Sequence, residues 1–122
     1  MEKERPQKVL LILNDPPYGS ERSYNGLRLA GSLVRSELTE VKVFLMGDAV
    51  ACARAGQDTP SGYYNVERML HLVTNHGGEV GACGTCLDAR GLKEGALTGG
   101  VHRSSLDELT SWARLADKVI VF

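Results

Sequence analysis

The chain has 122 residues, 43% of them hydrophobic, which fits one domain with its own core. Its 14 Lys and Arg residues balance 15 Asp and Glu residues to a formal net charge of −1, and no basic cluster interleaved with aromatic residues suggests a nucleic acid partner. The longest aliphatic run, residues 9–13, falls far short of the about 20 residues of a membrane span, and the charged start is not followed by a secretory leader. We therefore expect a cytoplasmic protein with no membrane contact. Its odd number of cysteines favours thiol chemistry over disulfide bonds.

The first half of the chain predicts two strands and two helices. Residues 1–7 are expected to form a flexible N-terminal tail, and residues 8–13 and 41–46 are apolar runs typical of strands buried on both faces. Between these strands, apolar residues recur at helical spacing at Tyr24, Leu27, Ala30 and Val34. Ser20 or Ser23 is the expected N-cap of this helix, and a short helix over 48–55 follows the second strand.

The second half repeats the alternation. A helix with Tyr63, Val66, Leu70 and Val73 on its buried face should end at Gly77-Gly78, before a strand over 79–83 and a short helix over 86–89. Residues 91–104 are ambiguous, with a short fifth strand possible near Val101. A capping box at Ser105–Glu108 starts the last helix, before a strand over 118–122. The expected buried side of that helix consists of Leu106, Leu109, Ala113 and Ala116.

This alternation predicts an α/β fold, a three-layer sandwich with a mostly parallel sheet of four or five strands and helices on both faces. The carboxyl ends of parallel strands lie on one edge, where sites collect. The loops after the first three strands should meet there. Their candidate pocket residues are Asn14, Asp15, Tyr18, Gly47, Asp48, Gly84 and Thr85.

The pair Cys83 and Cys86 carries the clearest chemical signal. Cys83 ends a predicted strand where a helix begins, so unpaired backbone N–H groups and the positive end of the helix dipole favour its thiolate. Cys86 lies one turn further, within reach of a disulfide, and is either a resolving cysteine or a bystander.

The other candidate ligands form a weaker pattern. Cys52 is expected to be a packed core residue, but Cys52, Cys83, Cys86 and one histidine would suffice for a zinc site, although no second ligand pair supports it. Of the histidines, His71 and His76 fall on a helix, and His102 is the better candidate for a proton partner. No phosphate-binding or dinucleotide motif follows any strand, so no cofactor is expected.

Three segments of the chain resemble the DsrE/DsrF-like proteins, which include the TusD subunit of a sulfur relay. They are Val9–Gly19, Phe44–Val50 and Cys83–Gly91, and the resemblance continues in order to residues 116–122. It implies an α/β domain that assembles into trimers or hexamers, with members that carry sulfane sulfur as a cysteine persulfide. In the relay members the sulfur-bearing cysteine lies eight residues before the glycine of an Arg-Gly pair, which corresponds to Cys83 ahead of Arg90-Gly91. The chain departs from them at Cys86, where they usually have a small apolar residue, which suggests a subgroup with a CxxC motif.

The resulting hypothesis is a small sulfur carrier, similar to a sulfurtransferase. Cys83 would accept sulfur as a thiolate from a donor protein and pass it to an acceptor protein, with Cys86 able to resolve the persulfide. Two alternatives stay open: a thiol–disulfide redox protein that uses the same pair, and a non-catalytic oligomeric or metal-binding module.

Overall fold

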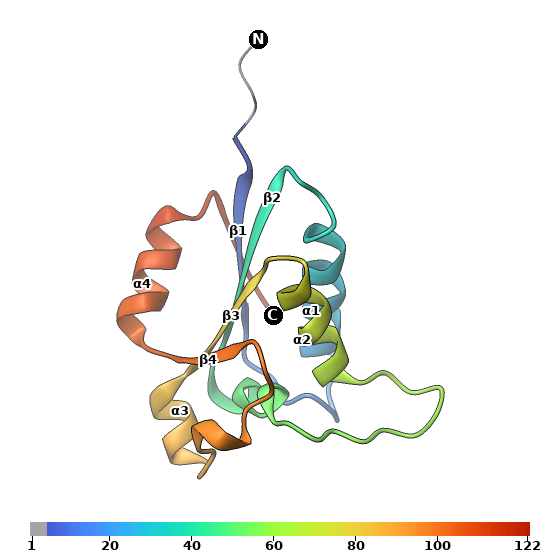
Figure 1. Cartoon of the computed structure of the whole chain (residues 1–122). Coiled ribbons are helices and arrows are strands. Elements are labelled where there is room, and N and C mark those ends of the chain that lie inside the picture. Colours follow the sequence, from blue (N-terminus) through green and yellow to red (C-terminus); the bar gives the residue numbers. More distant parts are fainter. Residues whose placement is uncertain (1–4) are drawn as a thin grey trace.

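A computed structural model describes residues 5–122, which form a five-stranded, fully parallel sheet (Figure 1). The strand order is β4-β3-β2-β1-β5. The strands are β1 (Gln7–Leu13), β2 (Thr39–Leu45), β3 (Glu79–Cys83), β4 (Val101–Ser104) and β5 (Lys118–Val121). The α-helices are α1 (Arg22–Leu33), α2 (Val66–Asn75), α3 (Gly84–Ala89) and α4 (Leu106–Leu115), and the 3-10 helices are η1 (Gly47–Ala53) and η2 (Glu94–Ala96).

The helices cover the two faces of this sheet unequally. Figure 1 shows α1 and α2 on one side of the sheet and α4 on the other. Alternate residues of β1 divide between the faces: Leu11 and Leu13 belong to the large core beneath α1 and α2, whereas Leu10 packs with Phe44 and Trp112 beneath α4. The predicted three-layer α/β fold is confirmed. Among residues 5–122 no helix combines the length and apolarity needed to cross a bilayer.

The strand β4 resolves the segment that the sequence left ambiguous. Val101–Ser104 pairs in parallel with β3, and the register places Ser104 beside Cys83. The last residues of β3 and β4, Cys83 and Ser104, thus lie side by side at the same edge of the sheet.

The strand β5 differs from its prediction as a strand buried on both faces. It lies at the edge next to β1, and Val119 and Val121 are 46% and 62% exposed. The cause is the path of α4, which packs on Leu10 and Phe44 near the middle of the sheet and leaves the same face of β5 open.

The starts of α1 and α2 can be compared with their expected positions, and that of α2 was wrong. Tyr63 is 72% exposed because α2 begins only at Val66, where the Asn65 side chain accepts a hydrogen bond from the N–H of Arg68 as the N-cap. Of the two expected caps of α1, Ser20 accepts a hydrogen bond from the N–H of Arg22 at 3.3 Å and donates to the carboxylate of Asp15 at 2.6 Å. Ser23 lies inside α1 and donates to the carbonyl oxygen of Asp15 at 2.6 Å, so it is not the cap.

The buried side of α4 and the extent of the tail also differ from expectation. Ser105 caps α4 as predicted, but Leu106 is 70% exposed and Ala113 is exposed, because the helix buries a narrower stripe at Leu109 and Trp112. Residues 1–4 of the expected tail lie outside the described residues, and Gln7 already belongs to β1.

Candidate functional site

Cys83 lies at the carboxyl end of β3 and immediately precedes α3. It is half-buried, and its side chain borders an open hollow of about 510 Å³, within the size range of small-ligand pockets. The residues lining this hollow are Phe44, Met46, Cys83, Gly84, Thr85, Cys86, Arg103, Ser104, Ser105 and Leu106. The sulfur is thus both accessible and partly shielded from water.

Hydrogen bonds to Cys83 favour its ionised form. Burial by itself raises the pKa of this thiol, but it is outweighed by the Thr85 hydroxyl, the Cys86 thiol and the backbone N–H groups of both residues, so that the pKa lies below its usual range. The Cys83 Sγ and Thr85 Oγ1 atoms are 3.3 Å apart. A thiolate with such donors is the nucleophilic form of cysteine.

Cys86 has the opposite tendency. Burial raises its pKa, and so do the hydrogen bond that it gives to Cys83 and the charge of that residue. Its Sγ accepts a hydrogen bond from the N–H of Gly47 at 3.2 Å, which ties α3 to the loop after β2. All three cysteines of the chain are free thiols. The pKa values of the two cysteines are therefore shifted in opposite directions, that of Cys83 toward the thiolate and that of Cys86 toward the protonated thiol.

Arg103 of β4 brings a positive charge to the hollow. Its two terminal guanidinium nitrogens each donate to one carboxylate oxygen of Asp88 in α3, both at 2.8 Å. The hydrogen bonds from Arg103 hold the pKa of Asp88 below its usual range, so this pair stays charged at neutral pH. The guanidinium lies directly over Gly84: a Cβ at that position would be 2.9 Å from three of its atoms. Only glycine allows this approach next to Cys83.

A second polar cluster adjoins the site behind β4. The buried Ser104 donates to Glu108 Oε1 at 2.6 Å, and His102 also contacts this carboxylate oxygen. Burial raises the pKa of Glu108, but these hydrogen bonds outweigh it and lower the pKa below its usual range. His102 is thus paired with Glu108 of α4, and it does not line the hollow at Cys83.

Of the candidate pocket residues, Gly84 and Thr85 line the hollow, and Gly47 and Asp48 lie behind it. Gly47 bonds to Cys86, and Asp48 forms an ion pair with Arg90 at 2.8 Å. Both residues therefore support α3 rather than face the hollow.

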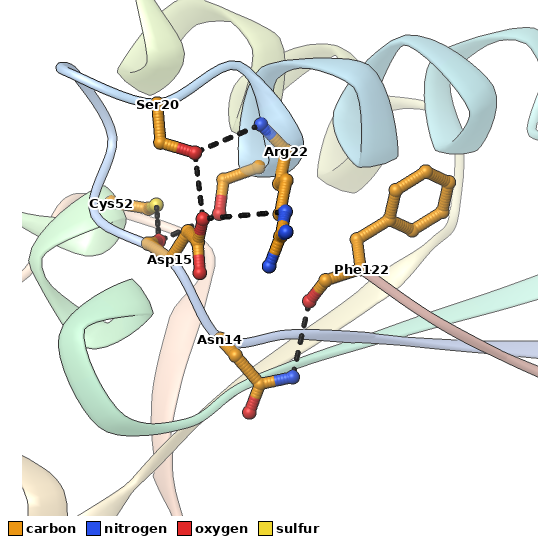
Figure 2. A network of polar contacts seen from close by, with 7 residues as sticks. Asn14, Asp15, Ser20, Arg22, Cys52 and Phe122 are labelled. Carbon is orange, nitrogen blue, oxygen red and sulfur yellow. Dashed lines mark hydrogen bonds and ion pairs between the residues drawn. The ribbon is translucent and has the colours of Figure 1, made fainter.

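Asn14, Asp15 and Tyr18 lie elsewhere, because β1 is two strands away from β3, a separation of roughly 10 Å. Figure 2 shows the side chain of Asn14 bonded to the carbonyl of Phe122, and Asp15 between Ser20 and Arg22. Tyr18 donates to Gln57 at 2.6 Å and accepts from a backbone N–H of α2.

The remaining candidate ligands are dispersed over the molecule. Burial raises the pKa of Cys52 to about 12, and its Sγ contacts the carbonyl of Asp15 (Figure 2). His71 is hydrogen-bonded to Thr98, and His76 to the carbonyl of Leu72. Within residues 5–122 no three His, Cys, Asp or Glu side chains are grouped as metal ligands, so the hypothetical zinc set is not assembled.

Sequence reasoning missed Arg103, Ser104 and their carboxylate partners. A signal was present: if Val101–Ser104 is a parallel strand, Arg103 and Ser104 end it on the same edge as Cys83. The pairing of Arg103 with Asp88 depends on which strand neighbours β3, and the sequence does not contain that order.

Known proteins share this architecture and much of this sequence. The model of the DsrE/DsrF-like family matches residues 7–122. The chain belongs to this family. The Escherichia coli protein YchN is 41% identical over 117 residues, which cover 95% of this chain and 99% of YchN. An uncharacterized protein of Methanopyrus kandleri is 38% identical over 115 residues, covering 93% of each chain.

Solved structures agree with the family assignment. The crystal structure of the Escherichia coli YchN protein matches with a TM-score of 0.89 over 95% of this chain and 99% of that one. A protein of unknown function from Methanobacterium thermoautotrophicum matches with a TM-score of 0.74 at 16% identity, which shows the shared fold alone. The resemblance to the DsrE/DsrF-like family is thereby confirmed, and it connects the chain to a family related to sulfur relay.

Proposed function

We propose that this DsrE/DsrF-like protein is a sulfur carrier in which Cys83 accepts sulfane sulfur as a persulfide. The observation that carries the proposal is the Cys83 thiol itself, whose lowered pKa coincides with access to a hollow. A carrier needs both properties, because the thiolate is the attacking species and the donor must reach it.

The transfer follows the chemistry of thiol–disulfide exchange. The Cys83 thiolate attacks the outer sulfur of a donor persulfide, the donor S–S bond breaks, and the donor leaves as a thiolate. In the second half, an acceptor thiolate attacks the outer sulfur on Cys83, and Cys83 is released as a thiolate. The transferred sulfur keeps its oxidation state in both half-reactions, so neither of them needs an external reductant or oxidant. In this scheme the protein acts as a carrier rather than as a multi-turnover enzyme.

Cys86 offers a second way to release the sulfur. As a thiolate it would attack the inner sulfur of the Cys83 persulfide, forming the Cys83–Cys86 disulfide and expelling the outer sulfur as hydrosulfide. This route reduces the carried sulfur and oxidises the two cysteines, so a dithiol reductant must restore the pair. The raised pKa of Cys86 keeps this route slow at neutral pH, which suits a carrier that must hold its cargo. We infer that the pair marks a CxxC subgroup of the family.

The partners follow from the same chemistry. The donor and the acceptor are proteins with reactive cysteines, and the cytoplasm, where thiols stay reduced, is the compartment we propose. The exposed Val119 and Val121, together with Leu106 and Leu115, leave apolar surface on the α4 face. We propose that copies of the chain cover it in a homo-oligomer, a trimer or hexamer.

Sulfur loading tests this function. The protein is incubated with a low-molecular-weight persulfide, excess donor is removed, and intact mass is measured for the wild type, Cys83→Ser and Cys52→Ser. We expect one added sulfur in the wild type and in Cys52→Ser, and none in Cys83→Ser. Equal gain by Cys83→Ser would show that Cys83 is not the acceptor.

A thiol–disulfide redox protein is the second candidate, favoured by the opposite shifts in the pKa of Cys83, which is lowered, and of Cys86, which is raised. Reduction of insulin by the dithiol form separates the two functions. If the protein loads sulfur but reduces insulin no faster than buffer does, the redox function is excluded and the carrier function remains. The non-catalytic module instead predicts neither loading nor reduction.

A further inference from the structure

We propose that Arg103 donates from its guanidinium to the terminal sulfur of a Cys83 persulfide, with Asp88 and Gly84 holding the guanidinium at that place. This inference rests on the proposed carrier function and assigns to Arg103 the role of keeping the cargo anionic and bound. It concerns the loaded state, whereas the hydrogen bonds described above act on the empty thiolate.

Adding a sulfur moves the negative charge away from its present donors. The Thr85 hydroxyl and the N–H groups of Thr85 and Cys86 act on Sγ of Cys83. In a persulfide the charge resides on the outer sulfur, about 2 Å further out. The outer sulfur therefore needs a hydrogen-bond donor other than those that act on Sγ.

The walls of the hollow offer few such donors. Phe44, Met46 and Leu106 are apolar, and the Ser104 hydroxyl already donates to Glu108. Among the lining residues in the described part of the chain, Arg103 is the one with a positive charge. A charge-assisted hydrogen bond from it would stabilise a perthiolate more than a neutral group can.

The guanidinium lies against Gly84, the residue that follows Cys83, and is hydrogen-bonded there. Two bonds to Asp88 and the contact with Gly84 set its position, and its side chain is about one-third exposed. Its bonds within residues 5–122 are those two to Asp88, which use only part of the N–H groups that a guanidinium carries. The hydrogen bond to Asp88 contributes most to raising the pKa of Arg103, against an opposing effect of burial; the charges of Asp88, Glu94 and, last, Cys83 raise this pKa further, which agrees with the proximity of Cys83.

The test compares persulfide lifetime and acidity between variants. Wild type, Arg103→Gln and Arg35→Gln are loaded with sulfur, and two quantities are followed by mass spectrometry: the loss of the extra sulfur with time, and the rate at which the persulfide is alkylated as a function of pH. Arg35 is the matched control, because it is an exposed arginine just beyond the end of α1 and is not among the residues that line the hollow.

We expect the persulfide of Arg103→Gln to decay about ten-fold faster than that of the wild type, the effect of one charge-assisted hydrogen bond, and its alkylation profile to move to higher pH. Arg35→Gln should match the wild type in both. A mere structural role for Arg103 would lower the melting temperature without moving the pH profile. Unchanged decay and an unchanged profile in Arg103→Gln would overturn the proposal.

A second variant moves the guanidinium without removing it. In Gly84→Ala the new Cβ would lie 2.9 Å from the guanidinium, which must shift, and Arg103 remains charged. We expect the same direction of change as in Arg103→Gln, and wild-type behaviour of Gly84→Ala would count against the proposal even if Arg103→Gln does not fold. Failure of the wild type to load sulfur on Cys83 would instead refute the carrier function itself, so the two failures are distinguishable.

Discussion

Replacing Thr85 by Val removes the side-chain hydroxyl nearest to the reactive sulfur with almost no change in shape. The Thr85 Oγ1 atom lies 3.3 Å from Cys83 Sγ, and Thr85 itself is exposed, so the core is not disturbed. The lost hydroxyl is a donor to the thiolate. Its removal disfavours the charged form, so the pKa of Cys83 must rise.

The size of this rise follows from the strength of the bond. A hydrogen bond to a charged group contributes about 1.5 kcal/mol at the lower end of the observed range, which suits a long bond to sulfur. At 1.36 kcal/mol for each pKa unit, this sets an upper limit of about one unit, and partial exposure of the pair reduces the expected rise to about 0.5 to 1 unit. Below the pKa the thiolate fraction then falls about three- to ten-fold. Because a more basic thiolate is also more nucleophilic, the observed rate falls only about two- to four-fold.

Thiol–disulfide exchange with an aromatic disulfide, followed by absorbance at a series of pH values, measures both quantities. The first phase reports Cys83, because the pKa of Cys52 is raised to about 12 by burial and that of Cys86 is raised as well. Thr85→Ser is the matched control, since it keeps the hydroxyl, and it should retain the wild-type pKa. A Thr85→Val profile that overlays those of the wild type and Thr85→Ser would refute the role of the hydroxyl.

Three further predictions concern the fold and assembly. Trp112→Ala should lower the free energy of unfolding by about 3 to 5 kcal/mol in urea titrations, since the ring is 6% exposed, whereas Tyr63→Ala, at a 72% exposed side chain, should change it by less than about 0.5 kcal/mol. Val121→Asp should leave the chain folded but reduce its mass in light scattering to that of a monomer; a wild type that is itself monomeric contradicts the homo-oligomer. Hydrogen bonds from Arg5 depress the pKa of Asp117, so this carboxylate stabilises the fold above the ordinary carboxyl pKa and loses that effect as the pH falls through its lower folded value. Melting temperatures of Asp117→Asn should therefore fall less steeply than those of the wild type between about pH 5 and pH 2, and parallel curves would contradict this.

Most of the fold was predictable because its signals are local. Continuous apolar runs predicted β1, β2 and β3. Gly77 was expected to end α2, and it follows that helix with a φ of +90°, a conformation that glycine adopts readily. Such signals depend on residues a few positions apart. They fixed the α/β class and the approximate limits of nearly every element.

The errors arose where tertiary context decides the outcome. Lys118–Val121 has the composition of a central strand, yet β5 is an edge strand whose outer face α4 does not reach. Leu106 matches the apolar stripe of α4 but projects from its first turn beside the hollow. In both cases a hydrophobic side chain is exposed in the single chain, which periodicity cannot distinguish from a buried one.

The candidate site illustrates the same division between local and long-range information. The position of Cys83 at a strand end followed directly from the sequence, whereas its surroundings depend on strand order. Because β3 lies between β2 and β4, Cys86 meets Gly47 from one neighbour and Gly84 meets Arg103 from the other, while the loop after β1 lies too far away to contribute. The reactive cysteine and its proposed charge partner therefore come from two adjacent parallel strands, and a strand order that placed another strand between β3 and β4 would separate them without altering either local motif.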